Sequence, residues 1–312
     1  MDNIKNLLNS GYSVEEICQK TNLSMQEIFT EVNKLKESGI YYYPKYGNNG
    51  EIFYTKNKVN EDDELKFNPV DNKFSFVGIA DLHVGSRYDD LKRLDILQDY
   101  IGTNDIHFII NTGDLIDGRS NENSSRLKRL FRLEDQAFEL LRKYPQLINL
   151  VTICVLGNHD LEAKSYDGFS FNEILRSSRH DFKVYSSGCG EIKVGNTTLF
   201  ICHDINDRRI KDRIKDDENM IVFSSHSHKS KENIYFNGKD MCLRYQLPSL
   251  SKIPECENVA SGFKRFDLYF DEYGFATGIH SIYYIFDNNN NLINVNEDHV
   301  NLNIGGNTRK RK

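Results

Sequence analysis

Short apolar runs recur along the chain from residue 74 onward, separated by polar or glycine-containing segments. The runs are apolar at most positions rather than at alternate ones, which is typical of strands buried on both faces. They cover residues 74–80, 106–111, 150–156, 197–202 and 220–224, and later strand-like runs cover 240–247, 266–270 and 279–286. Between the second and third runs, residues 124–144 have the spacing of an amphipathic helix. Its predicted buried stripe consists of Leu127, Leu130, Phe131, Ala137, Phe138 and Leu141. This succession of elements predicts an α/β domain over residues 73–286.

The first 59 residues follow a different pattern, with three short helices predicted before residue 39. The second and third helices begin with capping boxes, at 13–16 and 24–27, in which Ser and Glu satisfy each other's backbone amides. The third helix has apolar residues at steps of three and four, which predict its buried face: Met25, Ile28, Val32 and Leu35. Aromatic-rich runs then flank the turn at 47–50, which indicates a hairpin. Three helices followed by a hairpin resemble a winged helix-turn-helix domain over residues 1–59.

Two segments are polar and predict no packed structure. Residues 60–72 contain an acidic run and Pro69, and are expected to form a linker. Residues 287–312 are rich in asparagine and end in four basic residues, so they are expected to form a disordered tail.

The charge of the chain limits how it can contact nucleic acid. Its net charge is −6. Residues 1–59 hold seven basic and seven acidic residues, so the remainder, with 33 basic and 39 acidic residues, carries the whole excess. This balance argues against a protein that coats nucleic acid through bulk charge, and any such contact must be local.

Cysteine usage and hydropathy indicate the compartment. Six cysteines are scattered without a Cys-x-x-Cys pair, and no apolar run approaches the roughly 18 residues that a membrane span needs. The N-terminus lacks the basic-then-apolar layout of a signal peptide. A reducing cytoplasm, without membrane association, is therefore the expectation.

Polar motifs follow five of the apolar runs, and they contain five of the nine histidines. The motifs are Asp81-Leu82-His83, Gly113-Asp114-Leu115-Ile116-Asp117, Gly157-Asn158-His159-Asp160, His203 and His226-Ser227-His228. Oxygen and imidazole ligands without thiolate suit divalent cations such as manganese, iron or zinc. Asp81 and His83 are two residues apart in an extended segment and can reach one cation. The carboxylate of Asp114 can bridge two cations about 3.5–4 Å apart.

The order and spacing of these motifs resemble the calcineurin-like metallophosphoesterases, a superfamily that hydrolyses phosphate esters with two metals. The resemblance implies a two-sheet α/β sandwich flanked by helices, with the site at strand ends. It implies two divalent cations, with Mn²⁺ favoured and Fe or Zn as alternatives. By similarity, one metal would be held by Asp81, His83 and His228, and the other by Asn158, His203 and His226, with Asp114 between them.

The same resemblance implies roles for residues outside the ligand set. A water activated by both cations would be the nucleophile. His159 would contact the phosphate and protonate the leaving oxygen, with Asp160 orienting its ring. Asp117 is the expected acceptor for a ligand histidine. Arg87 and Arg119, in the loops after the first two motifs, are candidate phosphate contacts.

Two positions depart from the family pattern. Ser225 and Asp204 stand where glycine is usual. Neither changes a ligand type, so metal binding is still expected, and the departures bear on the local loop shape and hence on the subfamily. The four remaining histidines, His107, His180, His280 and His299, are expected to be structural or solvated.

The substrate class depends on the small N-terminal domain. The sequence Asp81-Leu82-His83-Val84-Gly85 resembles the start of the phosphoesterase subunit of double-strand-break repair nucleases. A winged helix joined to a hydrolase favours a polymer substrate, and DNA in particular. The third helix is rich in glutamate, so the hairpin lysines Lys45, Lys56 and Lys58 are the candidate DNA contacts.

Other functions remain open. The enzyme alternatives are a small-molecule or cyclic-nucleotide phosphodiesterase and a phosphomonoesterase. A non-catalytic DNA-binding regulator is a further alternative, although such a protein would have no need of His159. The N-terminal domain could also serve homodimerisation.

Overall fold

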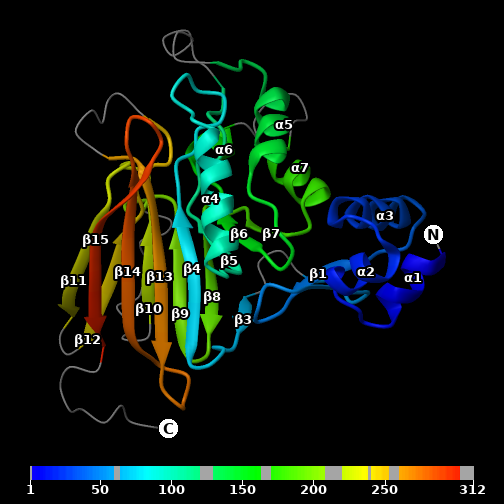
Figure 1. The fold of residues 1–312 in the computed structure, drawn as a ribbon, viewed down its shortest axis with the longest axis horizontal. Coiled ribbons are helices and arrows are strands. Elements are labelled where there is room, and N and C mark those ends of the chain that lie inside the picture. Colours follow the sequence, from blue (N-terminus) through cyan, green and yellow to red (C-terminus); the bar gives the residue numbers. More distant parts are fainter. Residues whose placement is uncertain are drawn as a thin grey trace.

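The computed structural model describes residues 2–59, 64–119, 129–162, 170–207, 220–237, 240–252 and 260–302. Within these residues, two β-sheets lie face to face, and helices cover the outer face of one of them (Figure 1). A smaller N-terminal unit lies beside this pair of sheets. The arrangement is an α/β fold with mixed sheets and is consistent with the predicted metallophosphoesterase sandwich.

The larger sheet has seven strands among the described residues, in the order β15-β14-β13-β4-β5-β6-β7. Strands β4 to β7 are parallel, and β13, β14 and β15 extend the sheet by antiparallel pairing. The strands are β4 (Lys73–Ile79), β5 (Phe108–Asn111), β6 (Val151–Val155), β7 (Phe182–Tyr185), β13 (Gly262–Phe270), β14 (Ala276–Phe286) and β15 (Leu292–Asn301).

The second sheet has six strands among the described residues, in the order β11-β12-β10-β9-β8-β3. The strands are β3 (Leu65–Phe67), β8 (Cys189–Val194), β9 (Thr197–Cys202), β10 (Met220–Ser224), β11 (Lys231–Asn237) and β12 (Asp240–Gln246). Each strand predicted from an apolar run is confirmed to within a few residues, and β9 and β10 match the predicted bounds.

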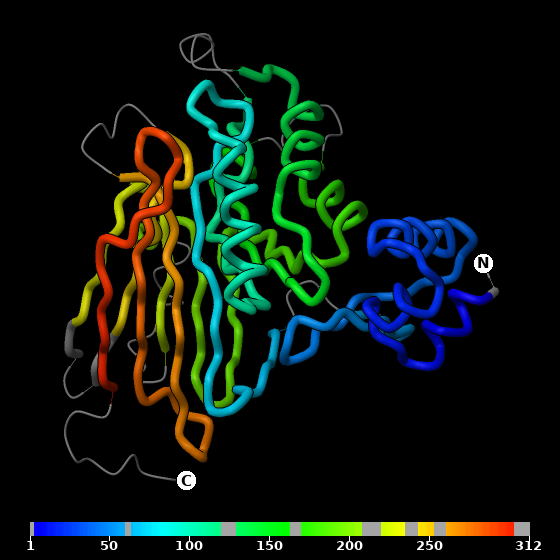
Figure 2. The backbone as a smooth tube through the Cα atoms, viewed as in Figure 1, coloured from blue at the N-terminus to red at the C-terminus, as the bar shows by residue number. Residues whose placement is uncertain are grey.

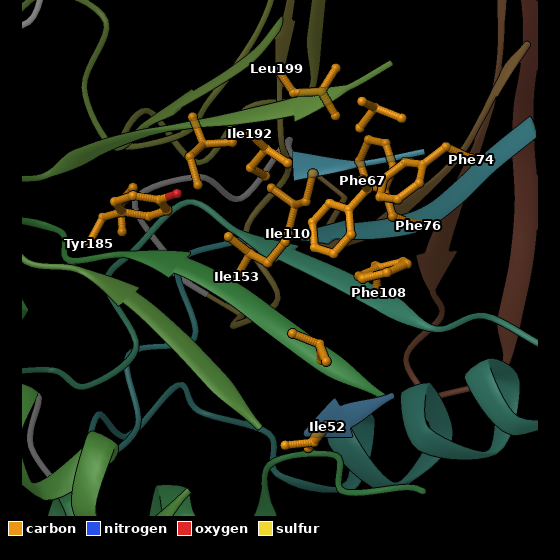
Figure 3. Close-up of a cluster of buried hydrophobic side chains, with 14 of the residues drawn as sticks. Ile52, Phe67, Phe74, Phe76, Phe108, Ile110, Ile153, Tyr185, Ile192 and Leu199 are labelled. Atoms are coloured by element: carbon orange, nitrogen blue, oxygen red, sulfur yellow. The ribbon is translucent and has the colours of Figure 1, made fainter. Parts of the chain in front are cut away.

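The main core lies between the two sheets. On β4, Phe74 and Phe76 point into this core, whereas Val77 and Ile79 pack in a second core beneath the helices. This alternation explains why β4 is apolar on both faces. Figure 3 shows the meeting of side chains from both sheets: Phe67, Phe74, Phe76, Phe108, Ile110, Ile153, Ile192 and Leu199.

The helical layer consists of α4 (Lys92–Thr103), α5 (Leu133–Lys143) and α7 (Phe171–Ser178), with the short α6 (Asn158–Glu162) at a strand end. The predicted helix 124–144 is only partly correct, because α5 begins at Leu133; residues 124–128 lie outside the described part. The predicted buried stripe is also wrong for Phe131 and Phe138, which are 60% and 70% exposed. The buried residues of α5 are Ala137, as predicted, together with Gln136 and Leu140, which the predicted stripe did not include.

The N-terminal unit contains α1 (Asp2–Asn9), α2 (Val14–Thr21), α3 (Met25–Glu37) and a hairpin of β1 (Tyr43–Tyr46) and β2 (Ile52–Thr55). Both predicted capping boxes are confirmed, at Ser13 and Ser24. The predicted apolar face of α3 is buried, joined by Phe29.

The N-terminal unit is docked on the β7–α7 side of the larger domain (Figure 2). From α3, Asn33 Nδ2 donates to the Ser177 carbonyl oxygen at 2.6 Å. From the hairpin, the Tyr46 hydroxyl donates to the Phe182 carbonyl oxygen at 3.0 Å, and the Tyr54 hydroxyl lies 2.6 Å from His180 Nδ1. One face of α3 is therefore occupied by contacts within the chain.

Two segments predicted to be irregular form strands instead. Residues 65–67 of the predicted linker form β3 and pair with β8, while 60–63 lie outside the described residues. The prediction of a disordered tail from residue 287 is wrong for residues 292–301, which form β15; residues 303–312 lie outside the described part. β15 has mostly exposed side chains and is held by backbone pairing with β14, so it lacks the apolar face that a sequence pattern would reveal.

Candidate metal centre

The predicted ligands converge where parallel strands of both sheets end. Asp81 follows β4, Asp114 follows β5, and Asn158 opens α6 just after β6. From the second sheet, His203 directly follows β9, and the His226-Ser227-His228 motif follows β10. The carboxyl ends of parallel strands in two stacked sheets thus meet at one edge, which brings distant parts of the sequence into one cluster.

The ligand candidates fall into two neighbouring groups. Asp81, His83 and His228 form one, with His83 Nε2 3.3 Å from His228 Nε2. Asp114, His203 and His226 form the other. Asn158 joins this second group, because its Oδ1 lies 3.0 Å from His203 Nε2 and 3.1 Å from His226 Nδ1. Apart from Asp114, which the family resemblance places between the two metals, this grouping has the same membership as the expected allocation.

Asp114 lies between the groups. Its Oδ2 is 3.1 Å from His203 Nε2 and 3.8 Å from His83 Nε2, so one carboxylate oxygen faces a histidine of each group. Its Oδ1 accepts a hydrogen bond from the His159 backbone amide at 3.0 Å. A carboxylate held in this position has the geometry required to bridge two cations.

Five ligand candidates have left-handed backbone: Asp81, His83, Asp114, His226 and His228 have φ between 45° and 72°. Such conformations cost of order 1–3 kcal/mol per residue and persist only where the surroundings enforce them. Here the Asp81 amide donates to the Gly113 carbonyl oxygen and the His83 amide to that of Asp114, each at 3.0 Å.

Two serines that the sequence did not predict as site residues also hold the Asp81 backbone in place. The hydroxyls of Ser249 and Ser251 donate to the Asp81 carbonyl oxygen at 2.9 and 3.1 Å. Both serines are buried. They lie in a segment without a recognisable motif, so no signal in the sequence could have found them.

Two glycines allow the motif loops to approach each other. A Cβ on Gly157 would lie 2.1 Å from Asp114 Oδ1, and a Cβ on Gly113 would lie 2.6 Å from the Gly157 amide nitrogen. Gly113 also has φ +104°, which side chains rarely adopt. Any residue other than glycine at position 157 would therefore displace the Asp114 carboxylate, and one at position 113 would push the two loops apart.

The electrostatics of the cluster fit bound cations. Both carboxylate oxygens of Asp81 are buried without a hydrogen bond of normal geometry to any described residue, and burial raises the pKa of this carboxyl well above its usual range. At Asp114, the hydrogen bond and charge of His203 outweigh burial and lower the pKa. A buried carboxylate that lacks hydrogen bonds of normal geometry, beside histidine nitrogens, is the donor set that a divalent cation satisfies.

Other contacts fix the orientation of the ligand histidines. His203 Nδ1 lies 2.9 Å from the Thr112 carbonyl oxygen, to which the Ser225 hydroxyl also donates at 3.1 Å. Ser225, which stands where the family pattern predicted glycine, is therefore buried against the carbonyl oxygen that contacts the candidate ligand His203. Asp117 Oδ1 lies 3.3 Å from His83 Nδ1, in the position predicted for it.

His159 and Asp160 are arranged differently from the expectation. His159 Nδ1 contacts the Asp117 carbonyl oxygen at 2.9 Å, and this contact, not Asp160, orients the ring. The Asp160 carboxylate instead accepts hydrogen bonds from the backbone amides of Leu115, Ile116 and Gly157, at 3.2, 3.0 and 2.9 Å. Asp160 thus ties the second and third motif loops together, and burial with the nearby charge of Asp114 raises its pKa to about 7.

The predicted substrate contacts lie at the surface. Arg87 and Arg119 are both exposed, in the loops after the first and second motifs. Lys45, Lys56 and Lys58 are exposed on the hairpin side of the N-terminal unit.

The calcineurin-like phosphoesterase family model matches residues 74–262, more than half of the chain, and the protein therefore belongs to this family. Membership indicates a metal-dependent phosphoesterase, in agreement with the ligand groups at the strand ends. No curated protein matches the chain at a significant level.

Several solved structures are similar in fold. Vps29 of Entamoeba histolytica in complex with Zn²⁺ is 16% identical and has a TM-score of 0.40, with 74% of this chain and 100% of that chain covered. Vps29 of Chaetomium thermophilum is 12% identical with a TM-score of 0.40, covering 73% and 98%. GAP50 of Plasmodium, an anchor in the inner membrane complex, is 12% identical with a TM-score of 0.43, covering 73% and 89%. Similarities this weak carry no functional conclusion.

Among the helices of the described residues, none combines the length and apolarity that crossing a membrane requires.

Proposed function

We propose that the protein is a two-metal phosphodiesterase, with Mn²⁺ as the favoured metal and DNA as its substrate. One observation carries the catalytic part: Asp114 Oδ2 faces His203 and His83, one histidine from each ligand group, at 3.1 and 3.8 Å. Asp81, His83 and His228 would hold one cation, and Asn158, His203 and His226 the other. When bound, the cations would polarise the phosphate and supply an activated water.

His159 would protonate the leaving oxygen of the ester. A carbonyl oxygen only accepts, so the contact with Asp117 requires the proton on His159 Nδ1. In the protonated ring, Nε2–H is then left to donate to the leaving oxygen of the ester. Donation leaves a neutral ring with its remaining proton on Nδ1, still held by the same carbonyl.

DNA is favoured over a small ester because of the N-terminal unit, which we propose to be a winged-helix domain. Its α3 uses Asn33 and Gln26 to bind the larger domain, so a DNA contact through this face of the helix is unavailable. Lys45, Lys56 and Lys58 remain exposed on and beside the hairpin. DNA contact would therefore run through the hairpin, to phosphates rather than to base edges.

A substrate panel tests the reaction class. The metal-loaded protein and its Asp114→Asn variant would be incubated with single- and double-stranded DNA, cyclic nucleotides, and chromogenic monoesters and diesters. We expect DNA cleavage, reduced at least about 10²-fold in Asp114→Asn, because a bridging metal ligand contributes several kcal/mol to transition-state stabilisation. Elemental analysis should show a lower metal content in the variant.

Each other outcome favours an alternative. Turnover of cyclic nucleotides or monoesters without DNA cleavage would select the small-molecule enzymes. Two bound metals with no turnover of any substrate would select the non-catalytic regulator. Two tightly retained ions in Asp114→Asn would refute the bridging role.

Lysine substitutions test the DNA contact separately from the chemistry. Changing Lys45, Lys56 and Lys58 to Gln should weaken DNA binding and reduce its salt dependence by up to about three units of slope, near 0.9 for each phosphate contact. Hydrolysis of a small chromogenic diester should be unchanged. A matched control would change Lys20, Lys34 and Lys36, which are exposed elsewhere in the same unit. Equal effects of the two triple variants would overturn the hairpin as the contact.

A further inference from the structure

We infer a third metal site, for a single transition-metal ion such as Zn²⁺, formed by His280 on β14 and by Glu297 and His299 on β15. These three side chains offer ligand atoms that lie within 4.8 Å of one another. None of them belongs to the five motifs at the strand ends, and the sequence alone predicts only structural or solvated roles for both histidines.

Strand register brings the three side chains together. His280 and His299 are direct partners in the antiparallel pairing of β14 and β15. Glu297 precedes His299 by two residues, so it emerges on the same face of the strand. Its Oε1 lies 2.7 Å from His280 Nε2 and 3.9 Å from His299 Nε2. One carboxylate oxygen thus faces a nitrogen of each imidazole.

A carboxylate also stands behind the most buried ligand. Asp267, the partner of His280 on β13, places its Oδ2 3.7 Å from His280 Nδ1. Asp267 is itself held, because its Oδ1 accepts from the Ser75 hydroxyl at 2.6 Å and lies 3.2 Å from Lys73 Nζ. Metal-binding histidines usually direct their second ring nitrogen to such a carboxylate, which fixes the ring and leaves the other nitrogen for the ion.

The ligand distances suit a zinc-like ion. Ligands about 2.1 Å from a tetrahedral ion are about 3.4 Å apart, between the two Glu297 distances. The His280 and His299 rings are parallel, with centroids 4.1 Å apart. The His299 and Glu297 side chains are 69% and 49% exposed, so both can rotate to converge on an ion. Two imidazoles with one carboxylate favour Zn²⁺, Ni²⁺ or Cu²⁺ over Mg²⁺ or Ca²⁺, and a water would fill the fourth position.

The site is remote from the strand-end metal centre, and it joins an edge strand to its neighbour. Asp267 pairs with Ser75, six residues before Asp81 in the sequence, which corresponds to about 20 Å along extended chain. β15 is an edge strand with β14 as its neighbour. An ion bound to both strands would fasten the edge strand to the sheet, as a cross-link does.

Metal stoichiometry in the full chain tests the site. The wild type and the variants His299→Ala and His280→Ala would be loaded with Zn²⁺, and bound metal would be counted by elemental analysis. We expect one equivalent fewer in each variant than in the wild type. His299 is largely exposed, so His299→Ala should fold even if His280→Ala does not. His107→Ala is the matched control and should keep every ion.

Further measurements separate this site from the catalytic one. Asp267→Asn should lower the affinity of the β14–β15 site for its ion about 10–100-fold, because it alters the carboxylate behind His280 without removing a ligand. Zn²⁺ should slow amide exchange in β15 of the wild type but not of His299→Ala. Phosphoesterase activity should be equal in wild type and His299→Ala. The metal count and the amide exchange do not depend on activity, so both remain informative if the proposed function is wrong. Equal metal counts in His299→Ala and wild type would overturn the site, as would no effect of Zn²⁺ on β15.

Discussion

Asp117 positions two histidines with different chemical roles. Its carboxylate lies 3.3 Å from Nδ1 of His83, a ligand candidate, and its backbone carbonyl contacts Nδ1 of His159 at 2.9 Å. The two imidazole rings pack edge to face with centroids 4.7 Å apart. A single loop residue therefore sets the spacing between the metal centre and the candidate general acid.

This geometry leads to a prediction for His159. His159→Ala should lower turnover about 10²–10⁴-fold, because a positioned general acid contributes that much. The metal content should hardly change, since His203, His226 and Asn158 remain in place. The measurements are steady-state kinetics on esters with good and poor leaving groups, together with elemental analysis.

Esters with very good leaving groups should suffer less in this variant, because they need no proton. An equal loss for all leaving groups would restrict His159 to positioning the phosphate. Loss of metal would make His159 a ligand and contradict the proposed allocation.

At the scale of elements, the loops that follow β5 and β6 have to touch. Asp160 accepts hydrogen bonds from amides of both loops, and Gly157 leaves no space beside Asp114. The position of the Asp114 carboxylate thus depends on how closely two strand-end loops pack, and not on Asp114 alone.

Gly157→Ala tests this dependence. The added methyl group would lie 2.1 Å from Asp114 Oδ1, so the carboxylate must move and metal content and activity should both fall by about 10-fold or more. The matched control is Gly102→Ala in α4, where the nearest atom to the new Cβ would be 3.6 Å away. This control should retain activity and gain about 0.5–1 kcal/mol in stability, because alanine favours helix. Normal metal content in Gly157→Ala, measured by elemental analysis, would contradict the steric argument.

At the scale of the whole molecule, the N-terminal unit and the phosphoesterase domain share a buried interface. His180 is central to it: its ring contacts Tyr54 at 2.6 Å, Asn33 at 3.2 Å and the Phe29 ring at a centroid distance of 4.8 Å. Removal of residues 1–59 would expose this surface, so substitutions are a cleaner probe of the N-terminal unit than truncation.

The interface predicts a dependence of stability on pH. Burial lowers the pKa of His180 to about 4, with the charge of Lys36 adding to burial and that of Asp181 opposing it. Between about pH 6.5 and pH 4 the unfolded chain takes up a proton at His180 that the folded protein does not. The free energy of unfolding is therefore unaffected by His180 above pH 6.5. As the pH decreases below 6.5, protonation of His180 in the unfolded chain lowers the free energy of unfolding, by up to about 3 kcal/mol.

Urea unfolding of the wild type and of His180→Gln at several pH values between 4.5 and 7.5 measures this effect. The difference between the two free energies should shrink or reverse as the pH falls, because glutamine does not titrate. Parallel curves for the two proteins would show that His180 is not the group responsible.

The sequence by itself determined the features that depend on neighbours along the chain. Apolar runs predicted the strands of both sheets, serine–glutamate pairs predicted the starts of α2 and α3, and the motif order predicted which residues meet at the metal centre. Burial period and capping chemistry act over a few residues, so a local pattern can encode them. Because only local patterns can be read from the sequence, two predictions were wrong. β15 was predicted to be disordered since it lacks an apolar face, and Phe138 was predicted to be buried since it fits a helical stripe.

The tertiary structure alone decided the features that join distant residues. Ser249 supports the carbonyl of Asp81 from 168 residues away, and Asp160 binds backbone amides instead of the His159 ring. The left-handed backbone at Asp81 and His83 is locally unfavourable, and packing across two sheets enforces it. The docking of α3 beside His180, and the row of Asp267, His280 and His299 across three strands, likewise depend on register and packing, which no local sequence pattern specifies.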